Sequence, residues 1–329
     1  MTVVRWAVVG TSDFALDWIA RGVTLGSNAE LAAVVSRDAA RAEAAARRVG
    51  APHWYTSIGA IDRNQVDGVF LVLPNPQHAP MAIAAAEHGL HVIVEKPMAP
   101  TVAECRAMIE AARANKVVLA AAHCMEWAPP IVAARRLLES AVIGNVLHAT
   151  ITASFNSPSN GQWRQQDTTE AGGGPLMDMG VHALDAITRL LGPVGQVAAM
   201  IDRQRHDYPA EDSATLLMRF VSGAHGVLQA NFTCLQNELE IQGTEGRIWS
   251  RAWWGRDFAG DLQLQRGDEV TSIALEPVNV YKPQIEHVSA AILSGTAPVT
   301  AGERGMANMA VIEAAIEAAR SGRTVTVAA

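Results

Sequence analysis

The chain has 329 residues, of which 49% are hydrophobic and only 18% charged, so it can fill two packed domains and leaves little room for long disordered segments. Its net charge of −7 with scattered lysines and arginines argues against a nucleic-acid-binding surface. The cysteines Cys105, Cys124 and Cys234 form no metal-binding spacing or disulfide framework. No leader-like segment or bilayer-spanning run is present, so we expect a cytoplasmic protein with no metal and no nucleic-acid or membrane partner.

The first part of the chain alternates short β-branched runs with alanine-rich segments. The expected strands are 3–9, 29–35, 68–73, 91–94 and 117–121, and the expected helices are 14–24, 39–49, 80–88, 102–114 and 130–140. Alternating strands and helices with short connections predict a doubly wound parallel α/β sheet. The strands are apolar throughout, as expected when helices cover both faces of a sheet.

After about residue 144 the hydrophobic period changes to two, most clearly in 147–155, 214–220 and 226–234. This period predicts an α+β part with an open, mainly antiparallel sheet, covered on one face by helices at 176–191 and 280–293. We therefore expect a dinucleotide-binding domain at 1–123, with a final helix bridging to about 143, and a substrate-binding, catalytic domain at 124–329. The uncovered face is expected to carry Thr150, Thr152, Ser154, Asn156, Gln229, Asn231 and Thr233. Such a polar face leaves a monomer and a homodimer both open.

The first strand leads directly into a loop typical of dinucleotide binding. A Rossmann fold needs a tight turn, close backbone approach to pyrophosphate, and a small residue where helix meets strand. Gly10 suits the turn and Ala15 the packing position, while Ser12 stands in place of the usual central glycine. The loop residues expected to contact the cofactor are Gly10, Thr11, Ser12, Phe14 and Ala15. The Ser12 hydroxyl could donate to a phosphate oxygen.

The end of the second strand bears on the choice between NADP and NAD. Enzymes that use NAD usually place a carboxylate there, whereas this chain has Ser36 followed by Arg37 and Arg41. A hydroxyl and a guanidinium suit a 2′-phosphate, so the sequence favours NADP(H), with NAD(H) possible. The other interpretation is that both arginines belong to a solvated helix start whose N-cap is Asp38.

Charged residues also follow the fifth strand, in Glu95-Lys96-Pro97. Ligands of open α/β sheets bind at the carboxyl ends of the strands, so Lys96 is placed where chemistry would occur. Pro97 ends the strand and can adopt a cis bond that would direct the lysine. The alternative is an ordinary strand end with a solvated lysine.

A glycine-rich segment, Gly172-Gly173-Gly174, precedes a second candidate group of residues. Asp178 and His182 are four residues apart on the predicted helix and therefore share a face. A histidine in this position can carry a proton while the carboxylate orients its ring. Asp185 lies further along the same helix. A single histidine on a helix is more often structural, so only the combination with Lys96 suggests catalysis.

Taken in this order, these motifs resemble the glucose-fructose oxidoreductase/inositol dehydrogenase/MocA family along essentially the whole chain. Further residues that carry the resemblance are Ser12, Ser36 with Arg41, Gln162-Trp163-Arg164, the stretch 170–182 and Asn279-Val280-Tyr281. The resemblance implies that Lys96 and His182 hold the substrate oxygen and handle its proton, with Asp178 supporting His182. It also implies cofactor contacts from Leu73, Pro74, Asn75, His78, Glu95, Lys96, Trp163, Arg164 and Tyr281, the last three from the second domain. The substrate residues it implies are Lys96, His123, Asn156, Trp163, Asp178 and His182.

The implied activity is hydride transfer between NADP(H), or NAD(H), and a carbonyl or secondary alcohol of a sugar or sugar derivative, such as an anhydro-ketose or inositol. Two alternatives share the fold. One is an NAD-dependent glycoside hydrolase that works by redox and elimination, and the other is a non-catalytic NADP-binding regulator, which would not need both Lys96 and His182.

Two features do not follow the expected pattern. Glu126 occupies a position where a reductase of this family carries an arginine, which changes the local charge near the expected substrate. Trp249, Trp253 and Trp254 lie close together in the sequence. They could line a sugar site or pack between domains or subunits.

Overall fold

The structure is a computed structural model that describes residues 2–159, 165 and 173–328. It divides into two compact units, one formed by Met1–His123 with Asn279–Met306 and the other by Cys124–Val278 with Ala307–Ala329. The sequence-based division placed everything after residue 123 in the second domain. The structure differs in that the segment Asn279–Met306 returns to the first unit.

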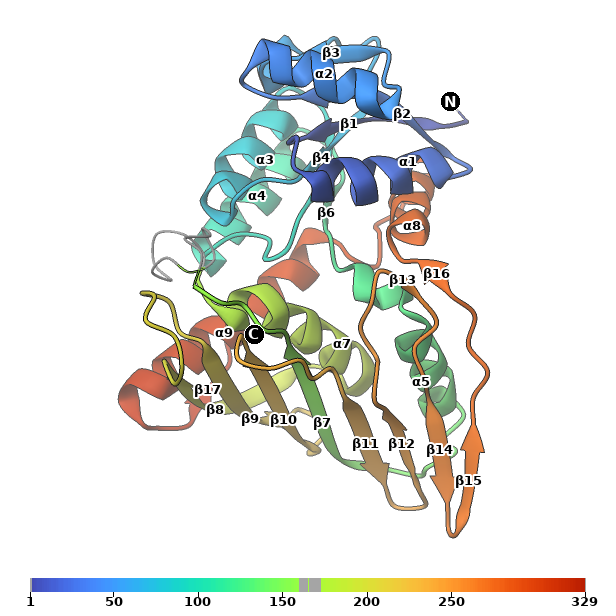
Figure 1. The fold of residues 1–329 in the computed structure, drawn as a ribbon, viewed down its shortest axis with the longest axis vertical. Helices are drawn as coiled ribbons and strands as arrows, with labels where there is room; N and C mark the ends of the chain where they lie inside the picture. The colour runs from blue at the N-terminus through green and yellow to red at the C-terminus, as the bar shows by residue number, and fades with distance from the viewer. Residues whose placement is uncertain (1, 160–164, 166–172, 329) are drawn as a thin grey trace. The chain divides into compact units, whose positions relative to one another are not determined.

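The first unit is built on a six-stranded sheet whose order is β3-β2-β1-β4-β5-β6, the Rossmann order (Figure 1). Every pair of neighbouring strands is parallel. The strands are β1 (Val4–Val9), β2 (Ala29–Val35), β3 (His53–Tyr55), β4 (Gly68–Leu71), β5 (His91–Val94) and β6 (Leu119–Ala121). The helices are η1 (Phe14–Ala20), α1 (Arg21–Leu25), α2 (Ala39–Val49), η2 (Ile58–Ala60), η3 (Asn75–Gln77), α3 (His78–Glu87), α4 (Val102–Ala114) and α8 (Tyr281–Ser294).

The central strands are buried on both faces, which confirms the predicted doubly wound sheet. All four residues of β4 and the last four of β1 are buried, as expected for strands with helices on either side. The edge strand β3 was not predicted, because its three residues His53, Trp54 and Tyr55 carry no apolar run. The helix expected at 14–24 begins as a π-helical segment, η1, and continues as α1.

The return segment belongs to the first unit because its helix α8 packs closely there. A Cβ on Gly22 of α1 would lie 2.8 Å from the Cβ of Tyr281, so the glycine allows the two helices to touch. The indole of Trp6 in β1 donates a 3.0 Å hydrogen bond to the Ser289 hydroxyl. Ile285 and Val288 of α8 are fully buried. Sequence periodicity predicted this helix but assigned it to the covered face of the antiparallel sheet, and that assignment is wrong, because α8 packs on α1, β1 and β2 of the first unit.

The second unit is built on a nine-stranded sheet with the order β15-β14-β12-β11-β7-β10-β9-β8-β17. Its strands are β7 (Val146–Ser154), β8 (Val194–Asp202), β9 (Ser213–Phe220), β10 (His225–Asn231), β11 (Leu239–Gly243), β12 (Arg247–Ser250), β14 (Gln263–Arg266), β15 (Glu269–Ser272) and β17 (Val325–Thr326). Only β7 and β10 pair in parallel among these described strands, and the other pairs are antiparallel. The predicted α+β fold with an open, mainly antiparallel sheet is confirmed.

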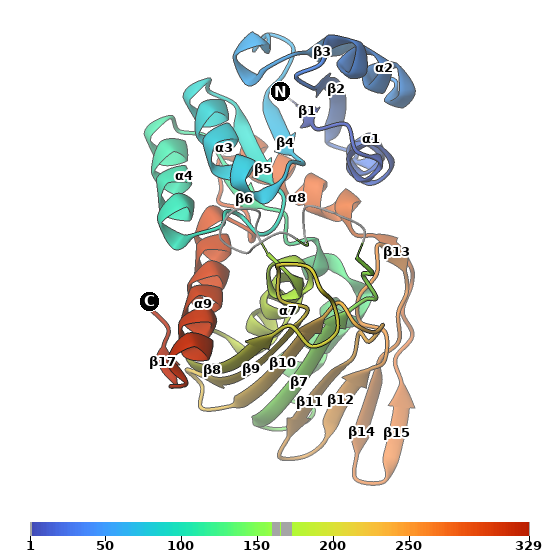
Figure 2. The ribbon, with the colours of Figure 1, turned by 60° about the vertical axis from the view of Figure 1, so that its left-hand side comes forward.

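The helices in the described part of the second unit include η4 (Cys124–Trp127), α5 (Pro129–Glu139), η6 (Leu176–Gly180) and α7 (Val181–Leu191). Helix α7 packs on β7 (Figure 2). Helix α9 (Gly302–Ser321) begins in the first unit and continues in the second, and a two-stranded ladder joins β13 (Asp257–Phe258) to β16 (Val278–Asn279). Among the described residues, no helix combines the length and hydropathy needed to cross a membrane.

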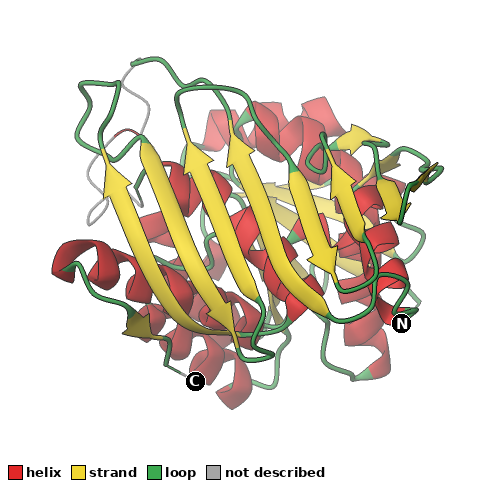
Figure 3. Ribbon diagram, turned by 90° about the horizontal axis from the view of Figure 1, so that it is seen from below, coloured by secondary structure: helices red, strands yellow, loops and turns green. Residues whose placement is uncertain are grey.

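The two faces of the nine-stranded sheet differ in polarity. Ile151, Leu216 and Leu228 are fully buried on the helix-covered face, as the period-two pattern predicts. Figure 3 shows the opposite face without a helix over it in the described part of the unit. Thr152 and Ser154, expected on that face, are buried, and their hydroxyls accept from the main-chain N–H groups of Glu238 and Asn231.

Candidate functional site

The loop after β1 has the geometry expected of a dinucleotide loop. Gly10 has a φ of 121°, and a Cβ there would lie 2.3 Å from the carbonyl oxygen of Val72, so no larger residue fits. The Ser12 hydroxyl accepts a 3.2 Å hydrogen bond from the Ala15 N–H at the start of η1. That bond uses an oxygen lone pair and leaves the hydroxyl hydrogen to donate. Ala15 is buried, as its packing role requires.

At the end of β2 the structure places an exposed pair of guanidinium groups. Arg37 and Arg41 are exposed, and within the described ranges neither guanidinium makes a hydrogen bond or ion pair. Asp38 is the N-cap of α2 and accepts a 2.8 Å hydrogen bond from the Arg41 N–H. The capping role considered for Asp38 is therefore real, and it leaves both arginine side chains able to bind an anion. Ser36 is half-buried beside them.

The loop after β4 was expected to line the cofactor groove, and its residues divide into two groups. Leu73 is half-buried and Pro74 exposed, whereas Asn75 is 2% exposed and His78 has no exposed surface. The expected groove contact of the His78 side chain is therefore not supported. Its ring lies below the loop, with Nδ1 2.8 Å from the carbonyl oxygen of Pro97 and Nε2 2.8 Å from that of Leu73.

His78 thus connects the loop after β4 to the residue that follows Lys96. Burial lowers the pKa of His78 to about 4, and the positive charge of Lys96 acts in the same direction. The two carbonyl contacts oppose this shift, because both favour a doubly protonated ring. Burial outweighs the two contacts, since no exposed surface remains to hydrate a charged ring. At neutral pH the ring then donates to only one of the two carbonyls.

The end of β5 presents the candidate catalytic lysine. Lys96 is half-buried, and its main-chain N–H donates a 3.2 Å hydrogen bond to a carboxylate oxygen of Glu95, which is 7% exposed. The Lys96-Pro97 peptide bond is cis. Since β5 lies beside β4, and β4 beside β1, Lys96 and the Gly10 loop occupy the same carboxyl edge of one sheet.

Tyr281 was expected to reach the cofactor from the second domain, and the structure corrects that. It lies in the first unit at the start of α8, where its ring makes an edge contact with Phe14 at a centroid distance of 5.8 Å. The Asn279 side chain caps this helix by accepting from the Tyr281 N–H at 3.1 Å. Tyr281 therefore supports the dinucleotide loop from within the same unit. His123, expected at the substrate, ends the first segment of this unit and is only 1% exposed.

In the second unit, the glycine-rich segment leads into a π-helical turn, η6, that continues as α7. Gly173 has a φ of 62°, and a Cβ on Gly174 would lie 2.1 Å from the carbonyl oxygen of Glu211. These two glycines therefore let the segment pass close to the loop before β9. The π-helical turn was not predicted, and such turns are frequent at functional sites.

The candidate acid–base residues lie on this helix. Asp178 is 9% and His182 6% exposed, and they are four residues apart, across the junction between η6 and α7. Asp185 has no exposed surface and accepts a 3.0 Å hydrogen bond from the amide of Asn308, which points to a structural role. Asn156 is exposed beyond the end of β7. Of the remaining candidates, Trp163 and Arg164 lie outside the described residues.

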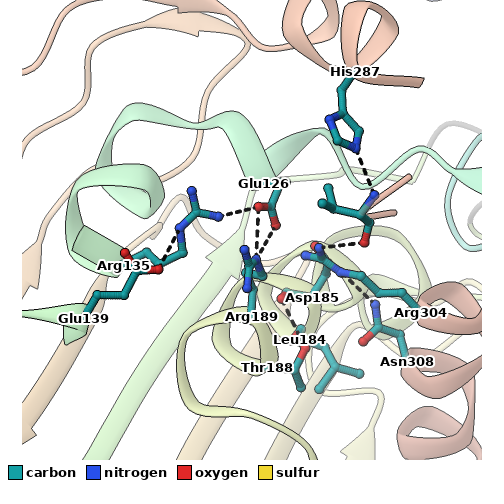
Figure 4. Close-up of polar contacts among 11 residues, drawn as sticks. Glu126, Arg135, Glu139, Leu184, Asp185, Thr188, Arg189, His287, Arg304 and Asn308 are labelled. Atoms are coloured by element: carbon teal, nitrogen blue, oxygen red, sulfur yellow. Dashed lines mark hydrogen bonds and ion pairs between the residues drawn. The ribbon is translucent and has the colours of Figure 1, made fainter. Parts of the chain in front are cut away.

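Glu126 does not bring an isolated negative charge to the second unit (Figure 4). Its carboxylate is 5% exposed, lies 2.6 Å from the guanidinium of Arg135, and accepts two hydrogen bonds of 2.9 and 3.0 Å from Nε of Arg189. Arg135 also lies 3.7 Å from Glu139. Because two arginines neutralise this carboxylate, the charge change noted in the sequence is compensated locally.

The three tryptophans separate into different environments. Trp253 is fully buried and its indole donates to the Thr152 carbonyl oxygen at 2.8 Å. Trp249 lies on β12 with the Arg247 guanidinium 4.6 Å from its ring centroid. Trp254 makes an edge contact with His182, with ring centroids 6.2 Å apart. The sequence left open whether Trp254 lines a sugar site or packs elsewhere, and its distance in sequence from His182 gave no signal of this contact.

The matches to known families cover both units. Residues 4–123 match the oxidoreductase family with an NAD-binding Rossmann fold, and residues 131–249 match the GFO/IDH/MocA C-terminal domain. The chain belongs to the GFO/IDH/MocA family. The resemblance inferred from the motifs is therefore confirmed, and the chain is an oxidoreductase with a nicotinamide-dinucleotide-binding Rossmann domain.

Individual relatives match over nearly the whole chain. The 1,5-anhydro-D-fructose reductase of Ensifer adhaerens is 28% identical, over 97% of this chain and 97% of that protein. D-xylose 1-dehydrogenase (NADP(+)) 2 of Haloferax volcanii is 29% identical, over 98% and 99%. The crystal structure of aldose-aldose oxidoreductase from Caulobacter crescentus, complexed with glycerol, has a TM-score of 0.93 and 29% identity, covering 98% of this chain and 99% of that one.

Proposed function

We propose that this protein transfers a hydride between NADP(H), in preference to NAD(H), and a carbonyl or secondary alcohol of a sugar or sugar derivative such as an anhydro-ketose or inositol. The observation that carries the proposal is the position of Lys96 at the same carboxyl edge of the sheet as the Gly10 loop. In open α/β sheets that edge holds the ligand, at the point where the strand order reverses.

The residues of the first unit fit a dinucleotide. Gly10 has the positive φ that such a turn needs, and the hydroxyl hydrogen of Ser12 can donate to a phosphate oxygen. Thr11, Leu73 and Pro74 are accessible beside it. At the end of β2, exposed Arg37 and Arg41 would hold a 2′-phosphate by charge-assisted hydrogen bonds, with Ser36 as a further donor. A carboxylate there would repel that phosphate.

The proton chemistry is assigned to Lys96 and His182. When bound, the nicotinamide accepts or supplies the hydride. During reduction, negative charge develops on the former carbonyl oxygen. We propose that the Lys96 ammonium and the His182 ring hydrogen-bond to that oxygen, stabilise the charge and supply the proton. In the oxidative direction they would accept that proton. Asp178 would orient the His182 ring, in keeping with its place one turn earlier on the same helix.

The sugar itself would be held by polar groups of both units. The candidates for substrate contact are Lys96, His123, Asn156, Trp163, Asp178 and His182. Two similar proteins support this substrate class, because their names are those of enzymes that act on sugars: 1,5-anhydro-D-fructose reductase and D-xylose 1-dehydrogenase. Asn156 is exposed and able to contact a ligand, whereas His123 has almost no accessible surface and would act through its backbone or neighbours.

The test is a panel of aldoses, ketoses, anhydro-ketoses and inositols, each assayed with NADPH, NADP, NADH and NAD by nicotinamide absorbance. We expect turnover of at least one sugar, with a higher kcat/KM for the phosphorylated cofactor. A double variant, Arg37→Ala with Arg41→Ala, should lower the kcat/KM for NADP(H) and spare that for NAD(H). Absence of turnover with every sugar and cofactor would overturn the proposal. Hydrolysis of a glycoside without added nucleotide would instead indicate a redox–elimination hydrolase.

A further inference from the structure

We propose that Arg48 is a positioning residue for the cofactor, because it binds the carboxylates of Asp13 and Asp17 beside the dinucleotide loop and prevents them from competing with the pyrophosphate. This inference rests on the proposed function, since it takes a nicotinamide dinucleotide to bind over the Gly10 loop. Arg48 itself lies outside that loop, in the last turn of α2. Its effect would be on the affinity for NADP(H) and NAD(H) alike.

Two acidic side chains lie at the beginning of the helix that follows the dinucleotide loop. Helix η1 continues directly as α1, so residues 14–25 form one helix, with Asp13 just before it and Asp17 in its first turn. The amino end of such a helix carries unpaired N–H groups and partial positive charge, which bind phosphate in Rossmann folds. A carboxylate is attracted to the same N–H groups and repels a phosphate. The segment therefore carries its own competing anions.

Arg48 holds both of these carboxylates. Its Nη1 atom lies 2.9 Å from Oδ1 of Asp13, and its Nη2 atom lies 2.6 Å from Oδ1 of Asp17. Aspartate is a preferred capping residue, yet the Asp13 side chain accepts no hydrogen bond from the N–H groups at the start of η1. The Ser12 hydroxyl accepts from the Ala15 N–H instead. The contact with Arg48 thus keeps the Asp13 carboxylate off the helix end.

The guanidinium also offsets charge where the cofactor would add more. The three side chains together carry a net charge of −1 with Arg48 and would carry −2 without it. The exposed fractions of the Arg48, Asp17 and Asp13 side chains are 48%, 51% and 85%. Solvent and salt screen charges that are this exposed, so the effect on affinity should be moderate and should weaken as the salt concentration rises.

Packing between the two helices fixes the place from which Arg48 reaches η1. Leu16 of η1 and Ala45 and Ala46 of α2 belong to one buried cluster. Arg48 follows in the last turn of α2, which ends at Gly50 with a φ of 74°. The guanidinium therefore extends from a helix end that is anchored against the helix bearing the two carboxylates.

The two ends of α2 would then serve different parts of the cofactor. Arg37 and Arg41, at its start, are proposed to bind the 2′-phosphate, which only NADP(H) carries. Arg48, at its end, would act on the pyrophosphate position, which both cofactors fill. Loss of the first two should change the preference between the cofactors, whereas loss of Arg48 should weaken both by the same factor.

The experiment measures the Kd values of NADPH and NADH by fluorescence titration, at about 20 mM and about 500 mM salt. In low salt, Arg48→Gln should raise both Kd values about tenfold, and in high salt by less than about threefold. Adding Asp13→Ala to Arg48→Gln should bring both values to within about threefold of wild type, because the competing carboxylate is gone. A purely structural role of Arg48 would not give this rescue.

The matched control is Arg47→Gln. Arg47 is the neighbouring residue on α2 and its loss changes the net charge equally, but it pairs with Glu43 at 2.8 Å. Both Kd values should stay within about twofold of wild type, since an exposed pair away from the loop contributes little. Thermal unfolding of each variant checks that the fold is retained.

The outcomes separate this inference from the proposed function. If wild type binds both nucleotides and Arg48→Gln binds them equally well in low salt, the inference is overturned and the proposed function stands. A loss that Asp13→Ala does not reverse, or one confined to NADPH, also overturns it. If wild type binds neither nucleotide, both fail. Should Arg48→Gln fold poorly, the double variant Asp13→Ala with Asp17→Ala should bind both nucleotides more tightly than wild type in low salt, and unchanged or weaker binding would overturn the inference.

Discussion

The two units position their candidate residues in different ways. In the first unit, the Gly10 loop and Lys96 follow neighbouring parallel strands and reach a common edge through topology. In the second, His182 lies on a helix, and its neighbour Trp254 arrives from a loop more than seventy residues later. In the parallel sheet, the order of the strands is enough to locate a site. In the unit with the mainly antiparallel sheet, a site depends on specific contacts between residues distant in sequence.

The supporting interactions differ in the same way. In the first unit, the supporting contacts involve main-chain carbonyl groups. The His78 ring contacts two carbonyl oxygens, and the Gly10 turn passes close to the carbonyl oxygen of Val72. Around α7 they join side chains, with Glu126 bound to Arg189 and Asp185 to Asn308. Substitutions in the first unit should therefore shift the positions of loops. A substitution in the second unit should weaken only the side-chain contacts of the residue that is replaced.

The largest effect is expected from the lysine of the first unit. Lys96→Met should lower kcat by about 10²–10⁴-fold, because the oxygen loses a proton-handling partner, while the Kd for NADPH should rise by much less, about tenfold at most, because Lys96 is only one of the expected cofactor contacts. Steady-state kinetics and NADPH fluorescence titration measure both. His182→Asn should have an effect of similar size although it lies in the other unit. Full turnover by Lys96→Met would contradict the assignment.

The turn after β1 provides the next largest effect. Gly10→Ala should destabilise the fold by about 2–4 kcal/mol, since it adds both a strained φ and an overlap with the Val72 carbonyl oxygen. NADPH affinity should also fall at least tenfold. Thermal unfolding and NADPH titration are the measurements. The control is Gly59→Ala, because a Cβ at Gly59 meets nothing within 4 Å. Equal behaviour of the two variants would show that the turn tolerates a side chain.

The stability of the fold should depend on pH through the buried His78 of the first unit. Because burial lowers its pKa to about 4, the unfolded chain binds a proton below pH about 6.5 that the folded chain does not. The resulting stability is present above pH 6.5 and is lost as pH falls toward 4, by up to about 3 kcal/mol. In His78→Gln the melting temperature should fall less over that range. Ring ¹⁵N shifts that show titration of His78 above pH 6 would mean that the carbonyl contacts outweigh burial.

The smallest effect is expected from the ion pairs of the second unit. Glu126→Gln should cost about 1–3 kcal/mol, because charge-assisted bonds to two partly buried arginines are lost. Denaturant unfolding should show this with sugar specificity unchanged. Glu139→Gln is the control: its side chain is 67% exposed and 3.7 Å from Arg135, so its removal should cost less than about 0.5 kcal/mol. A change of substrate preference in Glu126→Gln would place that carboxylate at the sugar after all.

The sequence by itself determined the parallel sheet, the position of Gly10 and Lys96 at its edge, and the family. These follow from local hydrophobic period and from motifs at strand ends, which depend on neighbours in the chain. It also located Asp178 and His182 on one helix, because their spacing is local.

Only the tertiary structure decided the contacts between residues distant in sequence. It placed Tyr281 beside Phe14 in the first unit, buried His78 beneath its loop, and neutralised Glu126 with arginines from two helices. It also brought Trp254 to His182. No local pattern encodes such pairs, because burial and charge compensation depend on which surfaces meet when the chain folds.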